Sequence, residues 1–423
     1  MRKLFETVVL GGTLTIACSD PNQGVASAPD SGLPTADAQV DATDAAPDAP
    51  TTVDPAGFRV TGALWHARSA HTATLLDDGR VLVVGGESVT TRSPLASVEL
   101  YDPVTESWTE GPTLPEARSN HVAVKLSDGR VLVAGGGISA PIGVPKGEGV
   151  LASALLYDPV SNSWTPTGEM HEARSHFAAL RLPSGNVLVA GGGAGTHDHG
   201  STCNGYGVTD CGPIGDALAS AEIYDTSKGT FAPTGPLASA RYSFTLDAAS
   251  GADALAVGGA NDFKESFAST ERFDEASGVW SPGPALASAD RLFHSAAPLP
   301  SGRLLVGGGK KSNTAMLNSA VWVDVKGMSS ELTGSLGTAH TVGAFVPLAS
   351  GHVLSVGGFT CPNPCAPIAL AEIYDEASGA WTGIGALATD RAGHSATRLK
   401  DGRVLVVGGF SAAGNLTSCE VTE

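Results

Sequence analysis

The sequence is poor in positive charge. Its 423 residues include 25 lysines and arginines against 43 aspartates and glutamates, which gives a formal net charge of −18. A protein that binds nucleic acid or an anionic lipid surface needs clustered basic side chains to neutralise phosphates. The shortage of such side chains argues against both as partners, and the acidic composition is most simply explained by solubility.

Motifs that carry chemistry are also missing. The sequence shows no glycine-rich phosphate loop, no paired-carboxylate motif and no recognisable set of nucleophile, base and acid. We therefore predict neither catalytic residues nor a cofactor.

Glycine, in contrast, is abundant and recurs in pairs. Each pair follows a short apolar segment, and the pairs begin at Gly85, Gly135, Gly191, Gly258, Gly307, Gly357 and Gly408. The successive spacings are 50, 56, 67, 49, 50 and 51 residues. In most copies a turn such as Asp401-Gly402 lies between this apolar segment and an earlier one. The pattern predicts seven copies of a β-hairpin that ends in a glycine pair.

Five copies carry a second signature. An aromatic residue followed by Asp lies seven residues before another aromatic, as in Tyr101 with Trp108, Tyr157 with Trp164, Tyr224 with Phe231, Phe273 with Trp280 and Tyr374 with Trp381. Strand-like composition around a polar turn predicts a second hairpin, so each copy supplies four antiparallel strands, a to d. Such a unit buries both faces only when copies pack side by side around a ring.

The double glycine after an apolar strand, the Tyr-Asp pair and the downstream Trp together resemble the Kelch family. The resemblance covers residues 58–423 and implies an all-β fold, a seven-bladed β-propeller. The final SCEVTE aligns with the third strand SVELYD, so the last copy lacks strand d. In most copies ten residues separate the strand-d aromatic from the next arginine, and counting back from Arg68 reaches Phe58. We expect Phe58 to begin the missing strand and to remove an open sheet edge.

The N-terminus resembles a bacterial export signal. Residues 1–18 contain basic residues and then an apolar run that is too short for a stable membrane span. Cys18 is the expected lipidation site; ordinary signal cleavage or no processing are the alternatives. Residues 19–57 hold seven aspartates and no lysine or arginine, which predicts a disordered tether. The protein would be held at the outer membrane or cell surface through its lipid alone, or be periplasmic or secreted.

Cysteine usage agrees with export. Cys203 and Cys211 lie in one insertion and Cys361 and Cys365 in another, so two local disulfides are the simplest pairing in an oxidising compartment. Cys419 occupies a position that is small and mostly apolar in the other copies, which predicts a buried free thiol.

The long insertions fall between strands b and c, at 137–149, 194–216 and 359–368. Antiparallel strand order places these loops on the face where every strand a begins, whereas the a–b and c–d turns lie on the opposite face. Binding residues often concentrate in loops on a rigid scaffold. We therefore assign binding to the face with the b–c loops.

A basic residue recurs at the start of strand a: Arg68, Arg118, Arg174, Arg241, Arg291, His340 and Arg391. Strand a is innermost in a propeller, so this ring could bind a carboxylate or sulfate at the channel mouth. A periodic glutamate on strand c, at 99, 222, 271, 372 and 420, favours a second interpretation in which the arginines form structural ion pairs. Histidines at 71, 121, 294 and 394 are most simply hydrogen-bonded spacers.

Two further features stay open. His197, Asp198 and His199 lie beside the cysteines of the third copy, and these ligand types suit zinc or copper. Export favours a disulfide there and a glycine-rich loop is a poor cage, so we expect substoichiometric metal. The fifth and sixth copies lose repeat residues, as where VWVDV replaces the Tyr-Asp strand, and this is either drift or a specialised sector.

Three functions fit the sequence. The first is a monomeric, noncatalytic module tethered at the surface, which binds a protein or glycan through the b–c loops. The Kelch resemblance implies a carbohydrate-active enzyme as an alternative, because this propeller type includes galactose oxidase and sialic-acid epimerases. Galactose oxidase chemistry needs tyrosine ligands and a cross-linked cysteine, whereas the tyrosines here are almost all repeat residues. The third is a structural component of the envelope.

Overall fold

A computed structural model describes residues 54–88, 93–138, 149–195, 217–262, 265–312, 316–361 and 365–423. The predicted lipidation site Cys18, the metal candidates His197, Asp198 and His199, and the pair Cys203 and Cys211 lie outside these ranges, and these predictions stay predictions. The described residues are built from strands and turns, and none of them belongs to a helix that could cross a membrane.

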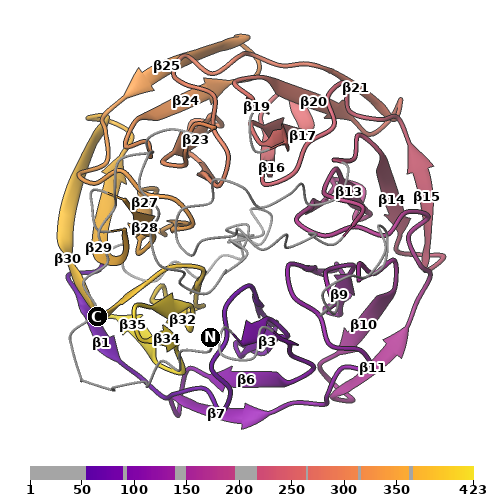
Figure 1. Ribbon diagram of the computed structural model, residues 1–423, viewed down its shortest axis with the longest axis vertical. Helices are drawn as coiled ribbons and strands as arrows, with labels where there is room; N and C mark the ends of the chain where they lie inside the picture. The colour runs from indigo at the N-terminus through magenta and orange to yellow at the C-terminus, as the bar shows by residue number, and fades with distance from the viewer. Residues whose placement is uncertain are drawn as a thin grey trace, which may run out of the picture.

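Seven antiparallel sheets surround a central axis as blades, which confirms the predicted seven-bladed β-propeller (Figure 1). Each blade has four strands, and in blade 6 the short strand β28 adds a fifth to the sheet. Blade 1 contains β2 (Thr72–Leu75), β3 (Val81–Val84), β6 (Val98–Asp102) and β7 (Ser107–Glu110). Blade 2 contains β8 (Val122–Lys125), β9 (Val131–Ala134), β10 (Ala154–Asp158) and β11 (Ser163–Pro166). Blade 3 contains β12 (Ala178–Arg181), β13 (Val187–Ala190), β14 (Ala221–Asp225) and β15 (Thr230–Thr234).

The other blades repeat this order. Blade 4 contains β16 (Thr245–Ala249), β17 (Ala252–Val257), β20 (Thr270–Asp274) and β21 (Val279–Pro282). Blade 5 contains β22 (Ser295–Pro298), β23 (Leu304–Gly307), β24 (Ala320–Asp324) and β25 (Ser329–Thr333). Blade 6 contains β26 (Ala344–Pro347), β27 (Val353–Val356), β29 (Ala366–Asp375) and β30 (Ala380–Arg391). Blade 7 contains β31 (Ser395–Arg398), β32 (Val404–Val407), β35 (Cys419–Thr422) and β1 (Phe58–Val60).

The first and last strands of the chain close the ring as predicted. β1 pairs antiparallel with β35, and Phe58 lies opposite Thr422. Asp54 also contacts blade 6, where it accepts a hydrogen bond from Ser350 Oγ (2.5 Å) and bonds with His352. Residues 54–57, which the sequence analysis assigned to the tether, therefore contact the propeller.

The glycine pairs follow strand b where the next blade comes closest. Both members of each pair have positive φ, which glycine adopts at low cost. At Gly408 (φ 57°) a Cβ would lie 2.7 Å from the carbonyl oxygen of Arg68 in the next blade. In blade 5 the sequence analysis began the pair one residue early, because Gly307 belongs to β23 and the positive-φ pair is Gly308-Gly309.

The innermost strands form a closed circle in which each contacts both neighbours. Just before each of them one residue has a φ between 47° and 59°, and the seven are Ala70, Asn120, His176, Ser243, Phe293, Val342 and Gly393. From Asn120 to Gly393, each N–H donates to the carbonyl of its counterpart in the preceding blade, at 3.1–3.3 Å. These backbone bonds join six of the seven blade junctions around the channel.

The junction between blades 7 and 1 is held by side-chain hydrogen bonds that lie farther from the channel. Arg59 Nη1 on β1 donates to Glu106 Oε2 of blade 1 at 2.6 Å, and Arg403 Nη1 of blade 7 donates to Glu106 Oε1 at 2.7 Å. Nearer the axis, Lys400 Nζ donates to the carbonyl of Asp77 at 2.5 Å. Side chains thus latch the place where the two ends of the chain meet.

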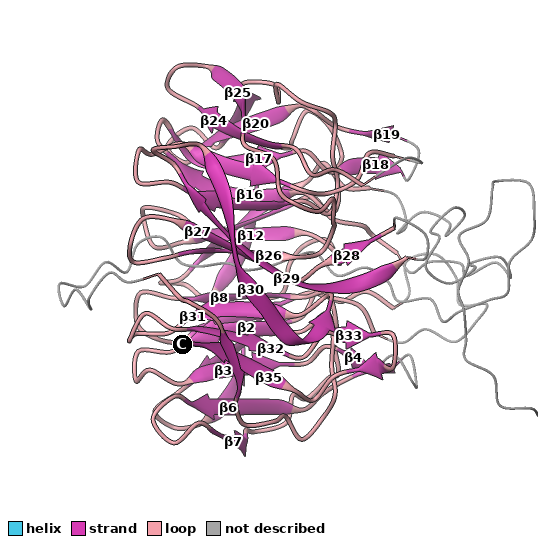
Figure 2. Ribbon diagram, turned by 90° about the vertical axis from the view of Figure 1, so that its left-hand side faces the viewer, coloured by secondary structure: helices cyan, strands magenta, loops and turns pink. Residues whose placement is uncertain are grey.

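The two faces of the ring differ. Short hairpins and strands project from one face only (Figure 2), namely β4 (Glu87–Ser88) with β5 (Ser93–Pro94), β18 (Ala260–Asp262) with β19 (Glu265–Ser266), β28 (Phe359–Thr360), and β33 (Phe410–Ser411) with β34 (Gly414–Asn415). All of them lie in b–c connections, which confirms the strand-order argument. We call this side the loop face and the opposite side, with the a–b and c–d turns, the turn face.

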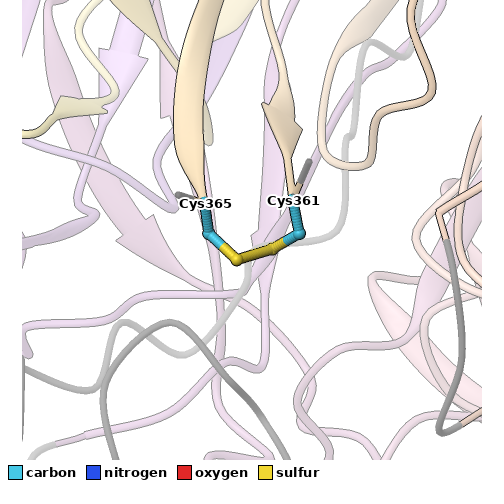
Figure 3. The surroundings of a disulfide bond; sticks show 2 residues. All are labelled: Cys361 and Cys365. Atoms are coloured by element: carbon cyan, nitrogen blue, oxygen red, sulfur yellow. A yellow bond between two sulfur atoms is a disulfide. The ribbon is translucent and has the colours of Figure 1, made fainter. Parts of the chain in front are cut away.

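Two cysteine predictions are confirmed. A disulfide joins Cys361 to Cys365 at the end of β28 and the start of β29, on the loop face (Figure 3). Cys419 is a buried free thiol in β35, and burial raises its pKa to about 12.

Candidate functional site on the loop face

The six arginines at the start of strand a are turned into the blades, where each is at most 1% exposed. In blade 7, Arg391 Nη1 donates to the carbonyls of Gly408 (2.8 Å) and Ser418 (2.9 Å), and Nη2 donates to Ser418 Oγ (3.1 Å). The same pattern holds in the other five blades, with the serines Ser97, Ser153, Ser220, Ser269 and Ser319. The guanidinium groups thus bind the glycine turn and the start of strand c.

Four of these arginines also pair with the strand-c glutamate of their own blade. The Nη2–Oε1 distances are 2.6 Å for Arg68 and Glu99, 2.9 Å for Arg174 and Glu222, 2.5 Å for Arg241 and Glu271, and 2.7 Å for Arg391 and Glu420. Each of these carboxylates accepts two further backbone N–H bonds from the linker that enters the blade, as from Ala388 and Thr389 to Glu420. This geometry favours the structural interpretation of the arginine ring over ligand binding.

Three blades lack this pair. Leu155 and Val321 occupy the glutamate position in blades 2 and 5. Burial there lowers the pKa of Arg118 and Arg291 to about 10. In blade 6 His340 replaces the arginine and donates from Nδ1 to the carbonyl of Thr338 at 2.9 Å, and burial raises the pKa of Glu372.

The serine partner escaped the sequence analysis. It lies two residues before the glutamate position in every blade that has the arginine, and blade 6 has Leu370 there. The joint loss of serine and arginine in one copy was the signal that these residues form a unit.

The histidines connect neighbouring blades. His71 and His121 share hydrogen bonds of 2.9 Å with Ser395 and Thr72 of the preceding blades, and His294 bonds with Thr245 at 3.4 Å. Where the preceding blade offers Val122 or Ala178 instead of a hydroxyl, phenylalanine replaces histidine, at Phe177 and Phe244. Two blades depart from this rule: the preceding blade offers Ala344 to His394, and it offers Ser295 to Gly343, whose carbonyl accepts a hydrogen bond from the Ser295 hydroxyl. These contacts agree with a spacer role.

Burial holds these imidazoles in the neutral form. Burial, and to a lesser extent the adjacent arginine of each blade, lowers the pKa of His121, His294 and His394 to about 3. The pKa of His71 is also far below its ordinary value for the same reasons.

The loop face breaks the sevenfold symmetry near the channel. Blades 4 to 7 contribute a buried apolar cluster that includes Tyr242, Leu292, Phe293, Val342, Phe359 and Phe410, and Cys365 packs against it. Blades 1 to 3 have Ser69, Ser119 and Ser175 at the positions of Tyr242 and Leu292. Of the departures that the sequence showed in copies five and six, Cys365 of the CPNPC insertion contacts this cluster.

The exposed side chain of Trp65 is a feature of the loop face that the sequence analysis missed. Among the described residues it is the one exposed large aromatic side chain, at 66%. The backbone N–H of Trp65 donates to Glu99 Oε2 at 2.7 Å, and the backbone N–H of His66 donates to Oε1 at 3.2 Å. The signal was present in the repeat, because the corresponding linker residues are Pro115, His171, Ala238, Ala287, Gly337 and Ala388.

Within the described ranges, no three His, Cys, Asp or Glu side chains gather in a way that would hold a metal ion. The predicted metal candidates of the third copy lie outside these ranges and are not part of that statement.

The two kinds of arginine provide a first prediction. Replacing Arg241 with Met leaves the buried Glu271 carboxylate unpaired, and we expect a loss of about 3–5 kcal/mol in the free energy of unfolding. Replacing Arg291 with Met leaves no strand-c carboxylate unpaired, because blade 5 has Val321 at that position. This variant should lose less free energy of unfolding. The double variant Arg241→Met, Glu271→Met should recover most of the loss. Equal losses for the two single variants in denaturant unfolding would contradict the role given to the pair.

A comparison with protein families finds that residues 68–115 match the Kelch motif. The match begins at Arg68 and runs through the four strands of blade 1. A search of the curated proteins finds no relative of the chain. Together with the seven blades and their recurring glycine pairs, the motif match supports the assignment of this chain as a Kelch-repeat β-propeller.

Proposed function

We propose that the chain is a noncatalytic interaction module that binds a protein partner through its loop face. Kelch propellers commonly serve as protein-interaction modules. The observation that carries the proposal is the asymmetry of the two faces: the b–c connections add hairpins to the loop face, and the linker that enters blade 1 adds an exposed tryptophan. A surface that departs from its own repeat is the place where a specific partner can be distinguished.

The contacts within the site support binding rather than catalysis. The arginines and glutamates that recur around the ring are buried, and the recurring serines bond to these arginines. Neutral, buried histidines are unsuited to proton transfer at physiological pH. The groups left at the surface of the loop face are the hairpins and the linkers between blades.

Blocking one face at a time tests the proposal. The probe is the tightest peptide selected on the unmodified full chain from a random-sequence phage library, and a glycan array is measured in parallel. A polyethylene glycol maleimide is coupled to Ala412→Cys, in the β33–β34 hairpin of the loop face, or to Val160→Cys, in the turn between β10 and β11 on the turn face. Both positions are exposed.

We expect the loop-face conjugate to weaken peptide binding by at least about tenfold, because the polymer covers the interface. The turn-face conjugate should bind like the parent chain, and the parent treated with the same maleimide controls for native cysteines. Loss of binding in the turn-face conjugate alone would contradict the proposal. Saturable binding to a glycan and to no peptide would replace the protein partner with a glycan.

A further inference from the structure

We infer that Trp65 anchors the partner of the loop face, and that this partner is a protein with an apolar pocket rimmed by basic side chains. The inference rests on the proposed function and adds to it a residue and a partner chemistry.

The exposure of Trp65 sets it apart from the other tryptophans of the fold. Trp108 and Trp280, which occupy the repeat position on strand d, are 7% and 9% exposed. Leaving an indole in water forfeits the large apolar area that a tryptophan normally buries. The repeat does not require it, because the other six linkers place proline, histidine, alanine or glycine there. Binding to a partner is therefore the role that remains for this side chain.

The backbone around Trp65 is held in place before any partner arrives. Glu99 accepts hydrogen bonds from Trp65 and from the next residue, and Arg68 pairs with the same carboxylate inside the blade. On the other side, Leu64 is buried in the cluster between blades 7 and 1, and its N–H donates to the carbonyl of Thr417 at 2.8 Å. A fixed main chain lowers the entropy lost when a partner binds the side chain. Tryptophan on such a support is a frequent hot spot of protein interfaces.

Two b–c connections meet beside this linker. The β33–β34 hairpin of blade 7 and β4 of blade 1 are joined by Asn415, whose Nδ2 donates to the carbonyl of Glu87 at 2.5 Å. Leu416 accepts a backbone bond from Arg68, the last residue of the linker. Trp65 therefore stands beside a surface contributed by two blades and not on an isolated loop.

Charge indicates the chemistry of the partner. The chain carries a net charge of −18, and the next linker around the ring places Glu116 at the surface, with its side chain 44% exposed. Glu116 lies 3.9 Å from the buried Arg118, and its exposed carboxylate together with the net negative charge favours basic groups around the pocket that receives Trp65. A neutral or acidic partner would gain nothing from this field.

The test compares Trp65→Ala with Val160→Ala, a matched removal of exposed apolar surface on the turn face, where Val160 is 94% exposed. With the library-selected peptide as probe, we expect Trp65→Ala to lower affinity at least about tenfold and Val160→Ala to leave it unchanged. The selected peptides should contain lysine or arginine near apolar residues, and their affinity should fall as salt rises. Thermal unfolding of both variants should match the parent, because neither side chain is buried.

The outcomes separate this inference from the proposed function. If coupling at Ala412 abolishes binding while Trp65→Ala retains parental affinity, the loop face is the interface but Trp65 does not anchor the partner. If coupling at Ala412 has no effect, the proposed function itself fails. Selected peptides without basic residues, or affinity that does not respond to salt, would overturn the basic rim.

Discussion

A chain that begins at Thr61 should associate more readily than a chain that begins at Asp54 and melt roughly 5–10 °C below it. The shorter chain lacks β1, so β35 would present an unpaired edge and favour association between copies. It also loses the contact of Phe58 with the cluster of blades 6 and 7 and the ion pair of Arg59 with Glu106. Light scattering and thermal unfolding of the two chains measure the effect.

The chain beginning at Asp54 is the matched control, because it keeps every described residue. A synthetic peptide of residues 54–60 added to the shorter chain should restore part of the lost melting temperature. Two chains that stay monomeric and melt together would show that β1 contributes little to closure.

Acid should destabilise the propeller below about pH 6.5. Burial depresses the pKa of His71, His121, His294 and His394 in the folded state, to about 3 in the last three. The unfolded chain takes up protons near pH 6.5 and the folded chain does not, so stability is present above pH 6.5 and is lost as pH falls toward 3. At pH 5 the loss is about 2 kcal/mol for each histidine. Denaturant midpoints between pH 7.5 and 5 measure it.

Two buried carboxyl groups, Glu372 and Asp247, oppose this trend, because burial raises the pKa of both. Burial raises the pKa of Asp247 to about 6, so its cost to stability is present at neutral pH and is relieved as the carboxylate takes up a proton below that value. These two carboxyl groups offset only part of the loss from four histidines. The net expectation remains destabilisation between pH 6.5 and 5.

His394→Phe provides the matched variant for this prediction. Phe177 and Phe244 already occupy this position in blades 3 and 4, where the preceding blade offers an apolar residue. The preceding blade likewise offers an apolar residue, Ala344, to His394. The variant should fold at neutral pH and lose less stability on acidification, by the contribution of one proton. An unchanged slope of stability against pH would show that His394 titrates normally in the folded protein.

The fold was predictable because the same sequence pattern recurs in seven copies. Seven glycine pairs fix the hairpins, and the absence of strand d after SCEVTE placed Phe58 in the last blade, as the pairing of β1 with β35 confirms. The error at Gly307 arose from three consecutive glycines, since letters alone do not show which of them leaves the strand with positive φ. The contacts of Asp54 were missed because a short polar segment carries no periodicity.

The site was less accessible to sequence reasoning. Periodic arginine and glutamate indicated an ion pair, but a repeated charge does not tell whether the side chain faces the channel or the blade. The match between histidine and the hydroxyl of the preceding blade joins residues about 50 positions apart and becomes visible only in the assembled ring. Trp65 lay in a linker outside both repeat signatures, so nothing in the periodicity drew attention to it.

The pairing of β1 with β35 also determines when the last blade can be completed during synthesis of the chain. During synthesis β1 emerges before the other strands of the propeller, and the strand it must join ends at residue 422, so β1 stays unpaired until that residue has been made. Six blades can assemble progressively from local hairpins, whereas the seventh brings together residues separated by almost the whole polypeptide. A ribosome that stops early would therefore release a molecule with a gap in its circumference.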